Sequence, residues 1–356
     1  MSRVITFGEI MGRLEAPGFT RFQQAMPGEL EVTFAGAEAT VAVSIAQLGG
    51  NAAFLTALPT HAVADACVAN LRSLGVDTSH ILRTSRGRLG LFFSETGANH
   101  RPSNVIYDRE GSSVALTPPE EYDWGTIFAG ASWFHMTGIT PALSQNAAEV
   151  SRVALREASS RGLRISMDMN FRSKLWNWAP PMKPRELAAK TLCELVPYVD
   201  IFMGGREDAA ELFGIRAEED ACDPHLEVAR KISARFPKIT HVAMSLRECI
   251  SASHNNWGGM LYEVAHDRAF RAPLKNDRYE PYVITNIVDR IGTGDAFAAG
   301  LIYALSQPEL SAPSKIISFA VAASCLAHSI KGDFNYITSA EIEALMDGDG
   351  AGRIKR

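Results

Sequence analysis

The sequence predicts an α/β fold in which a mostly parallel central sheet is flanked by helices and carries a small β-sheet lid. Short apolar runs typical of strands alternate along the chain with longer runs of helical spacing. Repeated β–α units of this kind favour a parallel sheet that is covered on both faces. Two segments, 13–34 and 84–113, break the alternation. We expect one domain over residues 1–356, with the lid formed from these two segments.

The expected strands are short and rich in β-branched or aromatic residues, as buried strands of parallel sheets are. They lie at 4–7, 53–58, 133–136, 164–167, 199–203 and 242–245. Between them the spacing of apolar residues predicts helices at 37–48, 64–74, 145–159, 186–195, 207–213 and 226–236. In such sheets the ligand site lies in the crevice beyond the carboxyl ends of the strands.

The two interrupting segments carry the period-two alternation of exposed strands, most clearly at 90–95. We expect them to form a small sheet that projects from the main body. If it closes over a site, it would exclude water from that site. Ordinary edge hairpins remain the alternative.

Composition excludes several classes of protein. The net charge is −5 and 46% of residues are hydrophobic, so neither a nucleic-acid nor a membrane partner is expected. The apolar run at 316–330 spans about fifteen residues, whereas a membrane span needs roughly twenty, so we interpret it as a buried helix. Five scattered cysteines without a CxxC pair are typical of reduced thiols, and we expect a cytoplasmic protein.

The segment 289–300, which contains Gly292-Thr293-Gly294-Asp295, is the most informative part of the chain. Larger apolar residues recur at helical spacing after Asp295, so a helix is expected to begin near Gly294. Glycines before a helix leave backbone N–H groups open, and together with the helix dipole these form a site for anions. Asp295 would then be placed to accept a proton from an attacking hydroxyl. On spacing alone, a plain helix cap is the favoured interpretation.

The order of motifs resembles that of the ribokinase-like (PfkB) carbohydrate kinases. The segment 289–300 is similar to their C-terminal signature, and 34–42 to their N-terminal glycine motif. Within the family the chain most resembles the 2-keto-3-deoxygluconate kinases, through segments 8–11, 105–109, 138–143, 168–176, 246–248 and 332–335. The resemblance runs in consistent order from about residue 4 to the C-terminus.

The resemblance implies a ribokinase-like fold and ATP-dependent, Mg²⁺-assisted phosphorylation of 2-keto-3-deoxygluconate to its 6-phosphate. Asp295 would be the catalytic base, with the amides of Gly292, Thr293 and Gly294 holding the transferred phosphoryl group. The implied sugar-acid contacts are Gly36, Phe92, Tyr107, Arg109 and Arg172. The nucleotide would meet Arg206, Ser245 and Arg247 together with Gly292 and Gly294, and Asp208 would hold the metal. The expected partners are these small molecules, and the family favours a homo-oligomer.

Chemistry agrees with an acidic substrate, because guanidinium groups such as Arg109 and Arg172 are suited to carboxylates. Each arginine could instead be a surface ion-pair partner. Gly205 stands where the family usually has the Asn of an Asn-x-x-Glu element, and Asp208 keeps the carboxylate on a shorter stem. That departure leaves two alternatives open: a kinase for a related sugar or sugar acid, and a catalytically weak sugar-acid sensor. A nicotinamide-dependent dehydrogenase is disfavoured, since no G-x-G-x-x-G follows the first strand.

Overall fold

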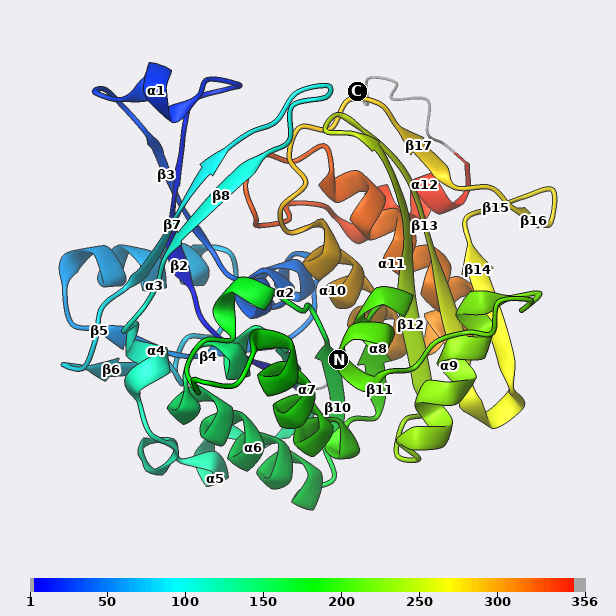
Figure 1. Ribbon diagram of the computed structural model, residues 1–356, viewed down its shortest axis with the longest axis horizontal. Coiled ribbons are helices and arrows are strands. Elements are labelled where there is room, and N and C mark those ends of the chain that lie inside the picture. Colours follow the sequence, from blue (N-terminus) through cyan, green and yellow to red (C-terminus); the bar gives the residue numbers. More distant parts are fainter. Residues whose placement is uncertain (1–2, 349–356) are drawn as a thin grey trace.

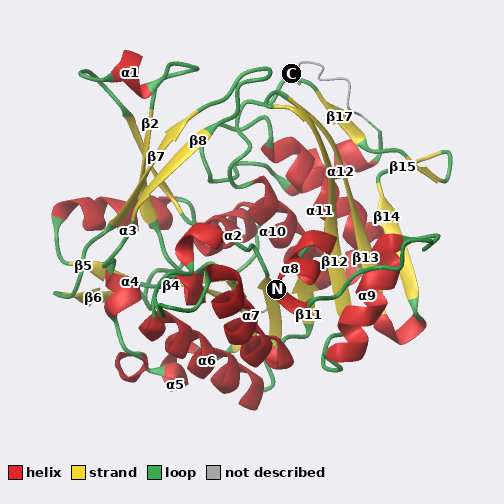
Figure 2. Ribbon diagram, viewed as in Figure 1, coloured by secondary structure: helices red, strands yellow, loops and turns green. Residues whose placement is uncertain are grey.

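The computed structural model describes residues 3–348 and is organised around a nine-stranded sheet (Figures 1 and 2). No helix in this range is long and apolar enough to cross a membrane. The strands lie in the order β14-β13-β12-β11-β10-β9-β1-β4, with β17 pairing to β13. Their bounds are β1 Arg3–Phe7, β4 Ala52–Leu55, β9 Ala131–Thr137, β10 Arg164–Asp168, β11 Ile201–Met203, β12 His241–Ser251, β13 His254–Glu263, β14 Arg268–Ala272 and β17 Tyr282–Ile284.

The pairing is parallel from β4 through β1, β9, β10 and β11 to β12. From β12 onward it is antiparallel, because β12 and β13 form a long hairpin to which β14 and β17 are added. The predicted mostly parallel sheet is therefore confirmed. Its antiparallel extension beyond β12 was not predicted, since this part of the sequence lacks the alternating helices that mark a βα unit.

Helices cover both faces of this sheet, and the strand side chains divide alternately between the two resulting cores. Val4 and Phe54 join one core, whereas their chain neighbours Ile5 and Leu55 join the other. The first core includes α2 Ala37–Gln47, α3 Ala62–Ser73, α10 Thr293–Leu305, α11 Pro313–Ala327 and α12 Ser339–Met346. The second includes α5 Trp124–Ile127, α6 Gln145–Ser160, α7 Pro184–Leu195, α8 Arg206–Phe213 and α9 Pro224–Arg235.

A separate four-stranded sheet is built from the two segments that break the sequence alternation. Its order is β3-β2-β7-β8, with bounds β2 Met11–Glu15, β3 Glu31–Ala35, β7 Gly90–Glu95 and β8 Asn104–Asp108. We call these four strands the small sheet. Figure 1 draws it in blue and cyan at one side of the molecule, with the β7–β8 hairpin reaching toward the β12–β13 hairpin. The short helices α1 Phe22–Ala25 and α4 Ser113–Leu116 flank its strands in sequence.

Several element boundaries differ from the prediction. The expected strand at 53–58 is divided in two, because β5 Ala57–Pro59 leaves the main sheet and pairs with β6 Leu82–Thr84. The strand expected at 242–245 continues to Ser251 as the first arm of the long hairpin. A further two-stranded ribbon joins β15 Leu274–Lys275 to β16 Arg278–Tyr279. The apolar run at 316–330 is largely the buried helix α11, as expected.

Candidate active site

A cleft of about 1400 Å³ opens at the carboxyl ends of the parallel strands. Residues that directly follow β1, β9 and β11, namely Glu9, Ile139 and Gly205, lie in its wall together with Asp168 at the end of β10. The small sheet and α10 contribute the other walls. Every residue that the sequence assigned to the site lines this cleft: Gly36, Phe92, Tyr107, Arg109, Arg172, Arg206, Asp208, Ser245, Arg247, Gly292, Thr293, Gly294 and Asp295.

The turn before α10 has the geometry that the glycine pattern predicts. Gly292 has a φ of 82°, a conformation that favours glycine, and a Cβ there would lie 2.6 Å from the carbonyl oxygen of Asp333. The first bond of the helix runs from Ala296 N to Gly292 O at 2.9 Å. The amides of Thr293 and Gly294 therefore have no partner within the helix. Both residues lie in the cleft wall, where these amides and the helix dipole favour an anion.

Asp295 lies in the first turn of α10 and is only 9% exposed. Burial raises the pKa of Asp295 well above its usual range, and the carboxylates of Asp168 and Asp333 raise it further. The positive charge of Arg172 lowers the pKa of Asp295. A carboxyl group with a raised pKa is a stronger base once it is ionised, which suits proton abstraction from a hydroxyl near neutral pH.

Asp168 and Asp208 are two further acidic residues of the cleft wall. Burial, and next the charge of Asp208, raises the pKa of Asp168 to about 7. Burial also raises the pKa of Asp208, whose Oδ2 accepts a hydrogen bond from Gly205 N at 2.8 Å. A divalent cation would favour the ionised forms of both carboxyls. Oxygen donors of this kind fit Mg²⁺, which retains several waters and needs few protein ligands.

The Mg²⁺ would depend on few side chains. Within residues 3–348, no group of three or more His, Cys, Asp or Glu side chains is arranged to hold a metal. At the departure from the family motif, Asp208 caps the start of α8 by accepting from the backbone amide of Gly205. The substituted motif thus keeps a carboxylate in the cleft wall.

Arg109 reaches the cleft from just beyond β8, but its guanidinium is already engaged. Its Nε donates to Glu9 Oε2 at 2.6 Å, and its Nη2 is ion-paired to the same oxygen. Both side chains are buried, so this is not the exposed surface pair that was the alternative. Tyr107 lies beneath the guanidinium, 5.4 Å from it, and Phe92 is opposite Tyr107 on β7. Sequence reasoning named Arg109 without its partner Glu9, although the Gly8-Glu9 motif had been noted.

Gly36 and Glu38 join the start of α2 to the sheet. A Cβ on Gly36 would lie 2.2 Å from the carbonyl oxygen of Glu9, so only glycine permits this approach. Glu38 Oε1 accepts from the Thr137 amide at 3.0 Å and from the hydroxyls of Thr137 and Thr140 at 2.7 Å each. Its carboxylate is one of the charges that raise the pKa of Asp295. Glu38 is a second cleft residue that sequence reasoning did not identify.

The other end of the cleft is lined by exposed polar side chains, most of them arginines. Arg206, Ser245 and Arg247 are exposed there, as is Arg172 on the loop after β10. The structure adds residues that the sequence analysis missed, which are Lys174, His225, Trp257, Arg271, Tyr279 and Arg290. Lys174 and Arg290 lie within the segments 168–176 and 289–300, whose resemblance did not assign them a role. The other four come from separated segments, including the antiparallel extension of the sheet, so no local motif could have indicated them.

Comparisons with known proteins match this chain to one family. The profile of the pfkB family carbohydrate kinases matches residues 1–254. The chain is 32% identical to the 2-dehydro-3-deoxygalactonokinase of Haloferax volcanii over 352 residues, covering 99% of this chain and 98% of that protein. It is 26% identical to the 2-dehydro-3-deoxygluconokinase of Bacillus subtilis over 299 residues, covering 84% and 81%. The crystal structure of the Thermotoga maritima 2-dehydro-3-deoxygluconokinase superposes with a TM-score of 0.88 at 37% identity and 98% coverage of both chains.

Proposed function

Because this chain belongs to the pfkB family of carbohydrate kinases, we propose that it transfers the γ-phosphoryl group of ATP to the 6-hydroxyl of 2-keto-3-deoxygluconate. The observation that carries this proposal is the position of Asp295, a buried carboxyl group beside the open amides of the turn 292–294. A base and an anion site within one helical turn are what phosphoryl transfer to a hydroxyl requires.

The 6-hydroxyl donates its proton to the Asp295 carboxylate as its oxygen attacks the γ-phosphorus, and the bond to the ADP leaving oxygen breaks. The amides of Gly292, Thr293 and Gly294 stabilise the charge on the transferred group. Asp208 would hold Mg²⁺, which when bound would neutralise phosphate charge. Closure of the small sheet over the cleft would exclude water.

Arginine side chains support an acidic substrate. Arg172 is exposed within the cleft, and Arg109 is held by Glu9 beside the ring of Tyr107. These guanidinium groups are suited to the substrate carboxylate. Gly36 and Phe92 would contact the carbon chain of the sugar, while Arg206, Ser245 and Arg247 would bind the nucleotide phosphates.

A second substrate candidate is the C4 epimer, 2-keto-3-deoxygalactonate. It is favoured by the name of the Haloferax volcanii relative, which is similar to this chain over nearly its full length. The epimers differ only in the orientation of one hydroxyl, so the charge argument fits both.

A substrate panel tests the proposal. We would measure ADP release with ATP and Mg²⁺ on 2-keto-3-deoxygluconate, its galactonate epimer, gluconate, fructose and ribose. We expect turnover of a keto-deoxy acid, and we expect Asp295→Asn to reduce kcat by about 10²–10⁴-fold while sugar-acid binding is retained. Preference for a neutral sugar would contradict the roles of Arg109 and Arg172. Absence of turnover with retained sugar-acid binding would favour the sensor alternative.

A further inference from the structure

Arg13 occupies an unusual position for an arginine, at the junction of the small sheet and the main body. It lies in the middle of β2 and is only 1% exposed. Because side chains alternate along a strand, Met11, Arg13 and Glu15 share one face of β2. Met11 on that face lines the cleft. The guanidinium of Arg13 extends from the small sheet to two loops of the main body. One loop precedes α10 and contains Asp289, and the other lies between α11 and α12 and contains Asp333.

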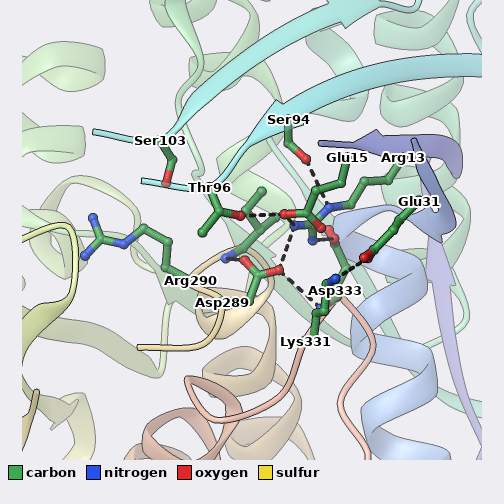
Figure 3. A network of polar contacts seen from close by, with 12 residues as sticks. Arg13, Glu15, Glu31, Ser94, Thr96, Ser103, Asp289, Arg290, Lys331 and Asp333 are labelled. Atoms are coloured by element: carbon green, nitrogen blue, oxygen red, sulfur yellow. Dashed lines mark hydrogen bonds and ion pairs between the residues drawn. The ribbon is translucent and has the colours of Figure 1, made fainter. Parts of the chain in front are cut away.

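Three carboxylates surround the guanidinium (Figure 3). Nη2 lies 2.6 Å from Asp289 Oδ2 and 3.0 Å from Glu15 Oε1, and Nη1 lies 2.7 Å from Asp333 Oδ1. Nε donates to Ser94 Oγ at 3.3 Å. All three carboxylate side chains are at least 90% buried. Because its two terminal nitrogens bind carboxylates on two different loops, Arg13 links these loops rather than forming a single ion pair.

The same carboxylates shape the phosphoryl-binding turn. Asp289 Oδ1 accepts from Ile291 N at 3.0 Å, and its Oδ2 accepts from Gly332 N at 3.2 Å. Gly292, the residue before α10, packs against the backbone of Asp333 so closely that a Cβ would lie 2.6 Å from its carbonyl oxygen. Arg13 therefore holds both sides of the turn that presents the amides of residues 292–294.

The electrostatics of the buried carboxylates also indicate a role for Arg13. Burial raises the pKa of Asp333 to about 6, and the positive charge of Arg13 opposes this rise. Asp333 also raises the pKa of Asp295. Without Arg13, buried carboxylates would remain uncompensated next to the place where a phosphate group must arrive.

We propose that Arg13 is a positioning residue for phosphoryl transfer, whose guanidinium bridges Asp289 and Asp333 and so fixes the turn 292–294 against the small sheet. This inference rests on the proposed kinase function. Arg13 does not touch substrate; it acts through the two loops, so it affects the transition state more than the binding of either substrate.

The first test is the split between kcat and KM in Arg13→Met, which removes the charge and the donors at similar side-chain volume. A displacement of about 1 Å at a reacting centre can cost about 10²-fold in rate. We therefore expect kcat to fall about 100-fold with the KM for ATP and sugar acid unchanged. An unchanged kcat, or a loss confined to KM, would overturn the inference.

A matched control comes from Lys331, which is ion-paired to Glu31 of β3 and so also joins the small sheet to the C-terminal loop (Figure 3). Lys331→Met removes a link between the same two parts but leaves Asp289 and Asp333 in place. We expect its kcat to equal that of the wild type. An equal loss in both variants would mean that general docking of the sheet, and not the Arg13 bridge, is what matters.

Two further variants separate positioning from folding. Arg13→Lys keeps the charge, but its ammonium group lacks the planar fork that spans two carboxylates. We expect a folded protein whose kcat is still reduced at least about tenfold; wild-type kcat would overturn the bridge. If Arg13→Met does not fold, Arg13→Lys carries the same comparison. Asp289→Asn should cost nothing further when added to Arg13→Met, whereas multiplying losses would contradict a shared mechanism.

A binding measurement keeps this test independent of the substrate. ADP with aluminium fluoride imitates the transferred phosphoryl group, and calorimetry compares its affinity with that of ADP alone. We expect wild type to gain affinity from aluminium fluoride and Arg13→Met to lose most of that gain while it still binds ADP. If wild type turns over no sugar in the panel, the proposed function fails, but this comparison still decides the role of Arg13. An equal gain in both proteins would overturn it.

Discussion

At the scale of single residues, the cleft combines buried acids with cationic side chains. Asp295, Asp168, Asp333 and Glu38 all line it, and burial raises the pKa of each of them. The charges of Asp168, Asp333 and Glu38 raise the pKa of Asp295 further, because a second negative charge nearby disfavours its ionised form. The charge of the cleft, and with it the availability of the base, therefore depends on pH.

We predict that Asp168→Asn shifts the acid limb of kcat/KM to lower pH. If Asp295 is the base, activity should rise with pH as Asp295 loses its proton. Among neighbouring charges, Asp168 contributes most to the raised pKa of Asp295. Removing that negative charge lowers the pKa of Asp295, so the ionised base persists at lower pH. The pH profile of kcat/KM with the preferred sugar acid measures this shift.

Asp220→Asn is the control, because Asp220 is an exposed residue in the loop between α8 and α9. It should leave the acid limb where it is. An acid limb that does not move in Asp168→Asn, or that moves to higher pH, would contradict the assignment of Asp295 as the titrating base.

At the scale of elements, the start of α10 depends on one glycine and tolerates change at another. Gly292 has a positive φ and packs against Asp333, whereas a Cβ on Gly294 would have no atom within 4 Å. The two glycines of this motif therefore serve different physical roles. Gly292 is needed for backbone shape, and Gly294 leaves space in the cleft.

We predict that Gly292→Ala lowers the free energy of unfolding by at least about 1–2 kcal/mol, the cost of a left-handed conformation for a residue with a Cβ. Contact with the Asp333 carbonyl adds to this cost. Gly294→Ala is the matched control, and we expect its stability to be unchanged or raised by up to about 1 kcal/mol. Urea unfolding of both variants measures the difference. Equal stabilities would show that the turn does not need its positive φ.

At the scale of the whole molecule, the small sheet is joined to the main body by the Arg13 bridge, by the Lys331–Glu31 ion pair and by contacts between the tips of two hairpins. Asn99, at the β7–β8 tip, accepts from Ala252 N at 2.7 Å through its carbonyl oxygen, and its own amide donates to Ser253 Oγ at 3.0 Å. These contacts join the β7–β8 hairpin of the small sheet to the β12–β13 hairpin of the main sheet.

We predict that ligands slow amide hydrogen exchange at the β7–β8 tip, residues 96–103, if the small sheet closes as a lid. The measurement uses Asp295→Asn with ATP and the sugar acid, so that turnover does not deplete the complex. The β5–β6 ribbon, which pairs in its own sheet, serves as the internal reference. Unchanged exchange at the tip would leave the four strands as a fixed wall of the cleft.

The sequence alone determined the elements whose causes are local. The alternation of strand and helix signals indicated the parallel sheet, because the helix of each βα unit must bury its apolar side against the sheet. Period-two runs at 90–95 indicated the small sheet, and the spacing after Gly294 located the start of α10. The motif at 292–295 predicted an anion-binding turn, since glycine conformation and helix ends are properties of a few consecutive residues.

Only the tertiary structure decided which distant side chains meet. Arg13 and Asp333 are separated by 320 positions, and Glu9 and Arg109 by 100, so no window of sequence contains either pair. The raised pKa of Asp295 likewise comes from burial and from charges on other elements, which exist only when the strands bring them together. Local chemistry is encoded in neighbouring residues, whereas electrostatic environment is a property of the packed molecule.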